Sequence, residues 1–446
     1  MHNLITIQDA IIVPFLLIVV YLISTKIKNK HITEKPYYKY FRIGLFAKIW
    51  AGLAFAAIYL FYYGGGDTIY YYWGTGNIIK MFGKDIPTFF KLLAGGHSAE
   101  VFSMFDRTTG WPTYFHDPNS FAVCRFNVPF YLLGFGSFLG NTIVLNIVLY
   151  FGVWRFYKML IELYPYNEKW LAYALFFIPS VVFWSSGLLK DGWTLTAILF
   201  IYTNIYFIFF KKEKIKQNIL WLILWGFIAI SIRPYIFYVA MASGLVWLTF
   251  SALRQIKSTF LRTIGLPIFL LIAWSFGALI FIQTSSLSNS RYASIDAMLE
   301  TAWIIQDDLK KDYYGGNSFD IGTFEPTIPG VLKKAPQAII AGMFRPFIWE
   351  GEGVLMLFSG LENLVLLLIF VWILLKTKII GFAQQTYKDP LLLSFAVMLI
   401  TFAFFIGLTT ANFGSLVRYV IPVKMLLIAV LILLYSRINI TNSNIQ

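Results

Sequence analysis

The sequence is poor in charge for its length. Only 13% of its 446 residues are Asp, Glu, Lys or Arg, whereas soluble domains carry about 25%. Hydrophobic residues make up 58% of the chain, and many apolar stretches reach the roughly 20 residues that cross a bilayer as a helix. No soluble domain of useful size fits between them. The composition therefore predicts an all-α polytopic integral membrane protein, with residues 1–446 forming one membrane domain.

Cysteine and histidine are also scarce. Cys124 is the single cysteine, which excludes a disulfide within the chain and a cysteine-based metal cluster. The four histidines, His2, His31, His97 and His116, form no His-x-x-x-His pair of the kind that binds zinc. We therefore predict no metal site and no cofactor, although the sequence leaves the use of a divalent ion open.

About eleven apolar segments have the length of transmembrane helices. We place them near residues 9–25, 43–63, 141–158, 170–186, 188–210, 218–232, 235–251, 264–283, 354–375, 390–409 and 419–436. The first segment lacks a basic start and a small-residue cleavage site, so we predict a retained helix rather than a signal peptide. We find no internal repeat, which weakly disfavours transporters built from repeats.

Lysine and arginine lie mostly in the loops on one side of these spans. We therefore interpret the net charge of +14 mostly as an indication of how the chain is oriented in the membrane. The largest clusters are Lys26–Lys30 and Lys211–Lys216. By the positive-inside rule that side is cytoplasmic, which puts the N-terminus outside and the C-terminus inside, in the inner (cytoplasmic) membrane. Because the lysines lie in separate short loops rather than on one basic face, we expect no nucleic acid among the partners.

Residues 121–138 are apolar but contain Arg125, Asn127 and Pro129. If this segment crossed the bilayer, the cluster Lys211–Lys216 would move to the outer side. The charge bias therefore predicts that the segment lies along the outer interface or re-enters the membrane.

Two long loops remain on the extracytoplasmic side, residues 64–140, with short interfacial helices, and residues 284–353. All other outer connections are short. Long loops on one face are more often functional than decorative, so we search them for a site.

Asp67 is the most informative residue of the first loop. It follows the span 43–63 across the glycine hinge Gly64–Gly66 and precedes an aromatic run that ends at Trp73. A carboxylate at a helix exit, on flexible backbone, is well placed for catalysis at a membrane surface. The same position suits the N-cap of the next helix, because Asp is a favoured cap and Gly a common helix end. The sequence leaves both interpretations open.

Several cations lie at the outer boundary, against the inward bias of basic residues. They are Lys190, Arg233, Arg345 and Arg418, and Glu350 lies close to Arg345 in the sequence. Any one of them is better explained as an interfacial anchor. Together they suit the binding of phosphate oxygens, which arginine contacts through two N–H groups at once.

Other acids compete with Asp67. Asp106 and Asp117 share the first loop with it, and Asp191 follows Lys190 directly. For Asp191 we favour a simple ion pair with Lys190. Acids of the second loop, such as Asp307 and Asp308, fit a solvated helix face.

The chemistry that needs such a set is transfer from a lipid-linked phosphate donor at headgroup depth. A carboxylate deprotonates or orients an acceptor hydroxyl while the sugar carbon develops positive charge. Cations stabilise the departing phosphate. The aromatic residues, 19% of the chain, suit sugar stacking, although a membrane-interface belt explains most of them.

The order of elements resembles the GT-C superfamily of polyprenyl-phosphate-sugar-dependent glycosyltransferases, of the polysaccharide-cluster type. Asp67 matches the family's catalytic acid after its first core helix, Arg125–Phe130 lies where the first loop re-enters, and Pro179–Gly187 with Lys190 and Asp191 resembles a turn of bacterial members. The likeness covers about residues 43–250. The chain departs from the family in an extra first span and in lacking a paired acid after Asp67.

This resemblance implies a glycosyltransferase that moves a sugar from a polyprenyl-phosphate donor to a glycan, lipid or protein acceptor. Asp67 is then the base, and the expected substrate-binding residues are Lys190, Arg233, Arg345, Arg418, Arg125 and Glu350. We expect one outer cleft lined by Asp67 and the first four cations.

Two other functions stay open. A polysaccharide polymerase or ligase would use lipid-diphosphate-linked oligosaccharides and also needs outer arginines. A transporter, flippase or non-catalytic envelope subunit is the third class, but a transporter should carry charge near the bilayer midplane. We read the span interiors as nearly free of charge, with Glu362 as the main exception.

Overall fold

The computed structural model describes residues 4–255, 295–308, 311 and 317–443. Within these ranges every extended regular element is a helix, and Ser318 and Asn412 form an isolated β-bridge. The chain divides into two compact units. Unit 1 comprises residues 1–208 and 212–234, and unit 2 comprises residues 209–211 and 235–446. Each unit is described by itself.

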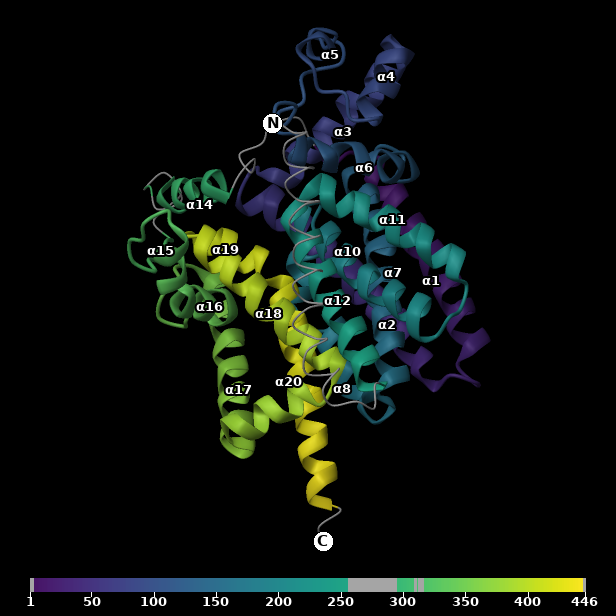
Figure 1. The fold of residues 1–446 in the computed structure, drawn as a ribbon. Coiled ribbons are helices and arrows are strands. Elements are labelled where there is room, and N and C mark those ends of the chain that lie inside the picture. Colours follow the sequence, from purple (N-terminus) through teal and green to yellow (C-terminus); the bar gives the residue numbers. More distant parts are fainter. Residues whose placement is uncertain (1–3, 256–294, 309–310, 312–316, 444–446) are drawn as a thin grey trace. The chain divides into compact units, whose positions relative to one another are not determined.

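Unit 1 is a bundle of long and short helices (Figure 1). They are α1 (Asp9–His31), α2 (Lys39–Ala57), α3 (Asp67–Lys84), α4 (Ile86–Leu93), α5 (Ala99–Ser103), α6 (Pro118–Leu133), α7 (Phe138–Leu163), α8 (Glu168–Phe176), α9 (Pro179–Trp184), α10 (Lys190–Ile205) and α11 (Ile215–Ile232). The π-helical turns η2 (Ile58–Tyr62) and η4 (Tyr206–Phe210) extend α2 and α10. Helix α7 packs against α2, α6, α8 and α10, and α3 packs against α6.

Unit 2 contains α12 (Pro234–Gln255), α14 (Ile295–Asp308), α15 (Ile328–Lys333), α16 (Ala335–Phe344), α17 (Val354–Tyr387), α18 (Pro390–Thr409), α19 (Phe413–Tyr419) and α20 (Ile421–Ser443). Helices α16 and α18 approach closely at two glycines. A Cβ on Gly407 would lie 1.9 Å from the carbonyl oxygen of Ala338, and one on Gly342 would lie 2.2 Å from that of Ala403. Small residues of this kind let membrane helices pack backbone to backbone.

The structure confirms the broad class, an all-α protein with several helices apolar enough to cross a bilayer. Eight helices among the described residues pass this test, or nine if the bent pair α19–α20 counts as one span. The expected span 264–283 lies outside the described residues. The expected helix 170–186 was wrong as one element, because Phe177 and Ile178 separate α8 from α9. Pro179 opens α9, and a proline suits a first helical position since it has no N–H to donate.

The segment expected along the interface, 121–138, forms most of α6, a helix of 16 residues. It lies outside the set of candidate spans. Asp117 caps its N-terminus and Gly134 ends it, and Ser137 then caps α7. The first expected loop, 64–140, is therefore largely helical, and three of its helices have an aspartate at their start: Asp67, Asp85 and Asp117.

Candidate functional site

Asp67 is the first residue of α3. Gly66 precedes it as the N-cap with φ of +121°, a backbone conformation that favours glycine. The Asp67 Oδ1 atom accepts a hydrogen bond of 2.6 Å from the hydroxyl of Tyr114. This partner comes from a segment far along the chain, so the carboxylate makes a tertiary contact, and the cap position itself belongs to Gly66.

Aromatic rings line the surroundings of this hydrogen bond. The rings of Tyr71 and Tyr114 lie 4.8 Å apart, and that of Tyr70 stands edge-on to Tyr114 at 6.2 Å. Burial, and then the nearby charge of Asp67, raises the pKa of Tyr71. Tyr71 therefore stays a neutral phenol, and the rings of Tyr70, Tyr71 and Tyr114 form an aromatic wall beside the Asp67 carboxylate.

A second carboxylate approaches from α6. Asp117 caps that helix and accepts hydrogen bonds from the Asn119 N–H at 3.1 Å and from the Ser120 hydroxyl. Its Oδ2 lies 3.6 Å from Nζ of Lys190, the first residue of α10. Burial acts to raise the pKa of Asp117, but Lys190 and the hydrogen bonds outweigh it, so this pKa lies below its usual value.

Asp191 pairs with Arg233 rather than with Lys190. The Arg233 Nη1 lies 2.7 Å from Asp191 Oδ1, and both side chains are buried. The expected pairing of Lys190 with Asp191 was therefore wrong. Neighbouring residues on a helix point about 100° apart, so Lys190 reaches Asp117 on α6 while Asp191 reaches Arg233 at the end of α11.

These pairs converge because three helices begin in the same part of unit 1. Asp67 opens α3, Asp117 caps α6 and Lys190 opens α10. Lys190 lies within electrostatic reach of both Asp67 and Arg233. Helix N-termini present free N–H groups and a positive dipole end. We call Asp67, Tyr114, Asp117, Lys190, Asp191 and Arg233 the Asp67 cluster.

A turn between α9 and α10 sets the position of Lys190 and Asp191. Lys48 from α2 donates hydrogen bonds to the Ser185 carbonyl at 3.0 Å, the Ser185 hydroxyl at 2.8 Å and the Ser186 hydroxyl at 3.3 Å. Asn146 from α7 donates to the Ser186 carbonyl at 2.8 Å. The backbone groups that this break frees from helical pairing are thereby satisfied, as burial in a membrane protein requires.

Our prediction that the interiors of the spans carry almost no charge missed Lys48. It is buried within a helix that can span the membrane. Lys424 was missed in the same way: it lies on α20, 1% exposed, with its Nζ 3.4 Å from Glu362 Oε1 on α17. A lysine inside an apolar run was the available signal, since charge at that depth is rare and costly.

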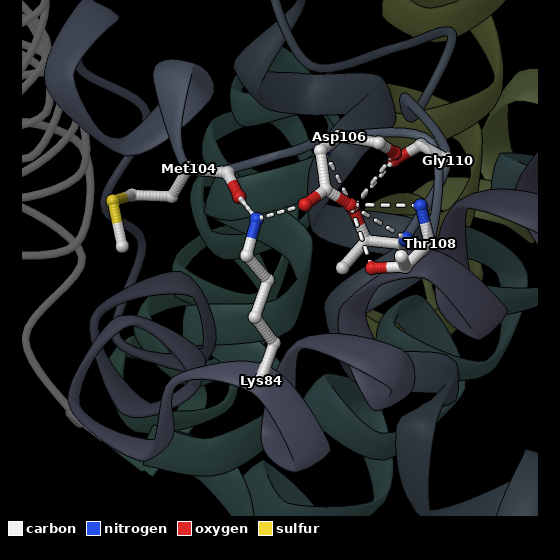
Figure 2. A network of polar contacts seen from close by, with 6 residues as sticks. Lys84, Met104, Asp106, Thr108 and Gly110 are labelled. Carbon is white, nitrogen blue, oxygen red and sulfur yellow. Dashed lines mark hydrogen bonds and ion pairs between the residues drawn. The ribbon is translucent and has the colours of Figure 1, made fainter.

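Asp106 has a local structural role (Figure 2). Its Oδ2 accepts a hydrogen bond of 2.6 Å from Lys84, and its Oδ1 accepts from the N–H groups of Thr108 and Thr109. Lys84 also donates to the Met104 carbonyl at 2.6 Å. The hydrogen bond from Lys84, followed by those from Thr108 and Thr109, lowers the pKa of Asp106, which makes this carboxylate a poorer base.

Arg125 lies on α6. A Cβ on Gly95, whose φ is +107°, would come within 2.7 Å of Arg125 Nη1. The guanidinium thus packs on the loop after α4. Its Nε is buried without a hydrogen-bond partner in the described part of the chain.

The remaining predicted site residues belong to unit 2. Arg345 Nη2 lies 2.8 Å from Glu350 Oε1, and Nη1 donates to the Asp320 carbonyl at 3.2 Å. Glu350 Oε2 also accepts from the Phe347 N–H at 2.9 Å. Arg418 lies in the last turn of α19. A cleft common to these residues and to the Asp67 cluster stays a prediction.

The described residues contain no group of three or more His, Cys, Asp or Glu side chains arranged to hold a metal ion. Searches against protein-family models, curated proteins and solved structures find no match to this chain.

Proposed function

We propose that this protein is a membrane glycosyltransferase of the GT-C type, which moves a sugar from a polyprenyl-phosphate-linked donor to a glycan, lipid or protein acceptor. One observation carries the proposal: the Asp67 cluster gathers three carboxylates, a lysine and an arginine where three helices begin. We place the reaction at the extracytoplasmic face of the inner membrane, on the side opposite the lysine-rich loops.

Asp67 is the base in this proposal. Its carboxylate takes the proton of the acceptor hydroxyl as the acceptor oxygen bonds to the sugar carbon. The bond between that carbon and the donor phosphate oxygen breaks, and its electron pair leaves with the polyprenyl phosphate. Tyr114 holds Oδ1 through its 2.6 Å hydrogen bond, which fixes the plane of the carboxylate, and the tyrosine rings offer an apolar surface to the sugar.

The donor phosphate binds near Lys190 and Arg233. Asp67, Asp117 and Asp191 carry three negative charges and the two cations carry two positive charges, so the cluster has a net charge of −1 before donor binds. The Lys190–Asp117 contact is 3.6 Å, longer than the roughly 2.8 Å of a strong charge-assisted hydrogen bond. We infer that the phosphate replaces Asp117 at Lys190 and also uses the N–H groups at the start of α10.

The test is release of polyprenyl phosphate by purified protein in liposomes supplied with a panel of polyprenyl-phosphate hexoses. We expect Asp67→Asn to lower release by about 10²- to 10⁴-fold, the usual contribution of a general base. Asp85→Asn is the matched control, because Asp85 caps α4 in the same region and Asn is an equally good cap. Equal activity of Asp67→Asn and the wild type would move the base elsewhere.

A second candidate, a transporter or flippase, draws on one observation in unit 2. The buried Lys424 pairs with the partly buried Glu362, and Lys424 follows a bend of 52° between α19 and α20. Charged groups beside broken helices are typical of transport pathways. Movement of the lipid-linked sugar across liposomes that survives Asp67→Asn but fails in Lys424→Met would favour this function, and the reverse pattern favours glycosyl transfer.

A further inference from the structure

A groove lies between α1 and α2, and none of its lining residues belongs to the Asp67 cluster. It has a volume of about 380 Å³ and is lined by Tyr21, Arg42, Ile43, Phe46, Ala47 and Trp50. The last four lie at positions i, i+3, i+4 and i+7 of α2, so they form one stripe along the helix. Ala47 is the small member of the stripe and leaves the hollow between its larger neighbours.

Arg42 is the single charged residue of the lining. Its Nη1 donates a hydrogen bond of 3.0 Å to the Thr25 hydroxyl, and its guanidinium carbon lies 5.0 Å from the centre of the Tyr21 ring. Among the residues that the structure describes, no carboxylate pairs with it. The guanidinium has five N–H donors, so most of its capacity to bind oxygens is not used by these two neutral contacts.

Arg42 lies in the first turn of α2, near the lysine-rich end of the α1–α2 pair. A short link, residues 32–35, joins α1 to the turn that precedes α2. This end carries Lys26, Lys28, Lys30, Lys35 and Lys39. Basic residues beside a membrane-spanning helix attract anionic headgroups, so both the charge of this end and the unpaired guanidinium favour a negatively charged occupant.

We propose that the groove binds one anionic phospholipid, with its phosphate at Arg42 and one acyl chain along the α2 stripe to Trp50. The stripe from Arg42 to Trp50 is about 12 Å long at 1.5 Å per residue. Tyr21 is 48% exposed and Trp50 54% exposed. Both therefore present ring surface to the hydrocarbon, which a soluble anion would leave uncovered. This site is independent of the proposed glycosyl transfer.

Native mass spectrometry of the purified full-length protein tests the proposal. The probes are phosphatidylglycerol and phosphatidylcholine of the same chain length. We expect one phosphatidylglycerol to bind in preference to phosphatidylcholine. Arg42→Gln should lower this preference by about fivefold, the factor expected for one basic residue at an anionic surface. Lys80→Gln is the charge-matched control, because Lys80 is exposed on α3 and lies outside both the groove lining and the lysine-rich end, so it should leave the preference unchanged.

Ala47→Phe separates the groove from the charge. It fills the hollow while leaving Arg42 in place, so we expect it to lower phosphatidylglycerol binding as well. Brominated phosphatidylglycerol locates the acyl chain, because it quenches the fluorescence of nearby tryptophans. The wild type should therefore lose more tryptophan fluorescence than Trp50→Phe. Equal binding of the two lipids, wild-type preference in Arg42→Gln, or displacement of phosphatidylglycerol by polyprenyl phosphate at equal concentration would each overturn the assignment.

Discussion

The hydrogen bond from the Tyr114 hydroxyl is the contact that most affects how the role of Asp67 is interpreted. From the sequence alone, Asp67 suited a helix cap and a catalyst equally well. The hydrogen bond from Tyr114 at 2.6 Å ties the carboxylate to a distant segment, and Gly66 takes the cap position. A side chain whose carboxylate is oriented by tertiary structure, within electrostatic reach of Lys190, fits a base better than a local cap.

Tyr114→Phe removes this donor and keeps the ring. Hydrogen bonds to charged groups contribute about 1.5–3 kcal/mol, so we expect polyprenyl phosphate release to fall by about 10- to 150-fold. Tyr70→Phe is the control on the same aromatic wall. Liposome assays of the two variants should separate them, and equal rates would remove Tyr114 from the mechanism.

Lys48 is the residue on which the turn before Lys190 depends. Lys48→Met keeps the length of the side chain but leaves buried oxygens of Ser185 and Ser186 without their donor. Unsatisfied buried groups of this kind cost about 1–3 kcal/mol each. We expect a lower melting temperature in detergent and weaker activity, whereas Lys80→Met at an exposed position should melt like the wild type. An unchanged melting temperature in Lys48→Met would contradict this role.

At the scale of elements, the region between α2 and α7 folds as the four helices α3 to α6, which side-chain contacts hold together. Lys84, at the end of α3, reaches Met104 and Asp106 and closes the segment that follows α5 (Figure 2). Asp117 and Ser137 cap α6 and α7. These contacts bring Tyr114 back to the start of α3, so the Asp67 cluster depends on them even though they take no part in the chemistry.

The Asp106 contact predicts a pH dependence. Its pKa in the folded protein is lowered, chiefly by Lys84, so the stabilisation is present above the ordinary pKa of 3.8 and is lost as pH falls through the lowered value. Asp106→Asn should mimic this loss at neutral pH. We expect faster hydrogen exchange of residues 104–110 in that variant, measured by mass spectrometry. Hydrogen exchange of residues 104–110 in Asp106→Asn at the wild-type rate would show that the contact with Lys84 does not hold this segment in place.

At the scale of the whole molecule, the distribution of lysine and arginine predicts one orientation in the membrane. Cys124 is fully buried, and burial raises the pKa of its thiol to about 12, so the native thiol should not react with a membrane-impermeant maleimide. The wild-type protein should therefore not be labelled, and labelling of a variant with one added exposed cysteine reports on that position alone.

In spheroplasts we expect Glu100→Cys and Asp307→Cys to react with this maleimide. Lys30→Cys and Lys216→Cys should react only in inverted vesicles, because their loops carry the basic bias that stays cytoplasmic. Labelling of Lys216→Cys from outside would mean that α6 crosses the bilayer and would invert the later spans.

Composition and hydropathy alone determined the class of this protein, because long apolar runs with so little charge suit a bilayer, where the backbone must satisfy its hydrogen bonds within helices. They also located most long helices, such as α18 at Pro390–Thr409, since long apolar runs have few alternatives. Hydropathy could not predict the break between α8 and α9, nor the pairing of Asp191 with Arg233. Ion pairs depend on which helices meet and on the direction of each side chain, and only the tertiary structure decides both. It brings Lys48 to a turn 137 residues away in the sequence, and it places the starts of three helices side by side in one cluster of charged residues.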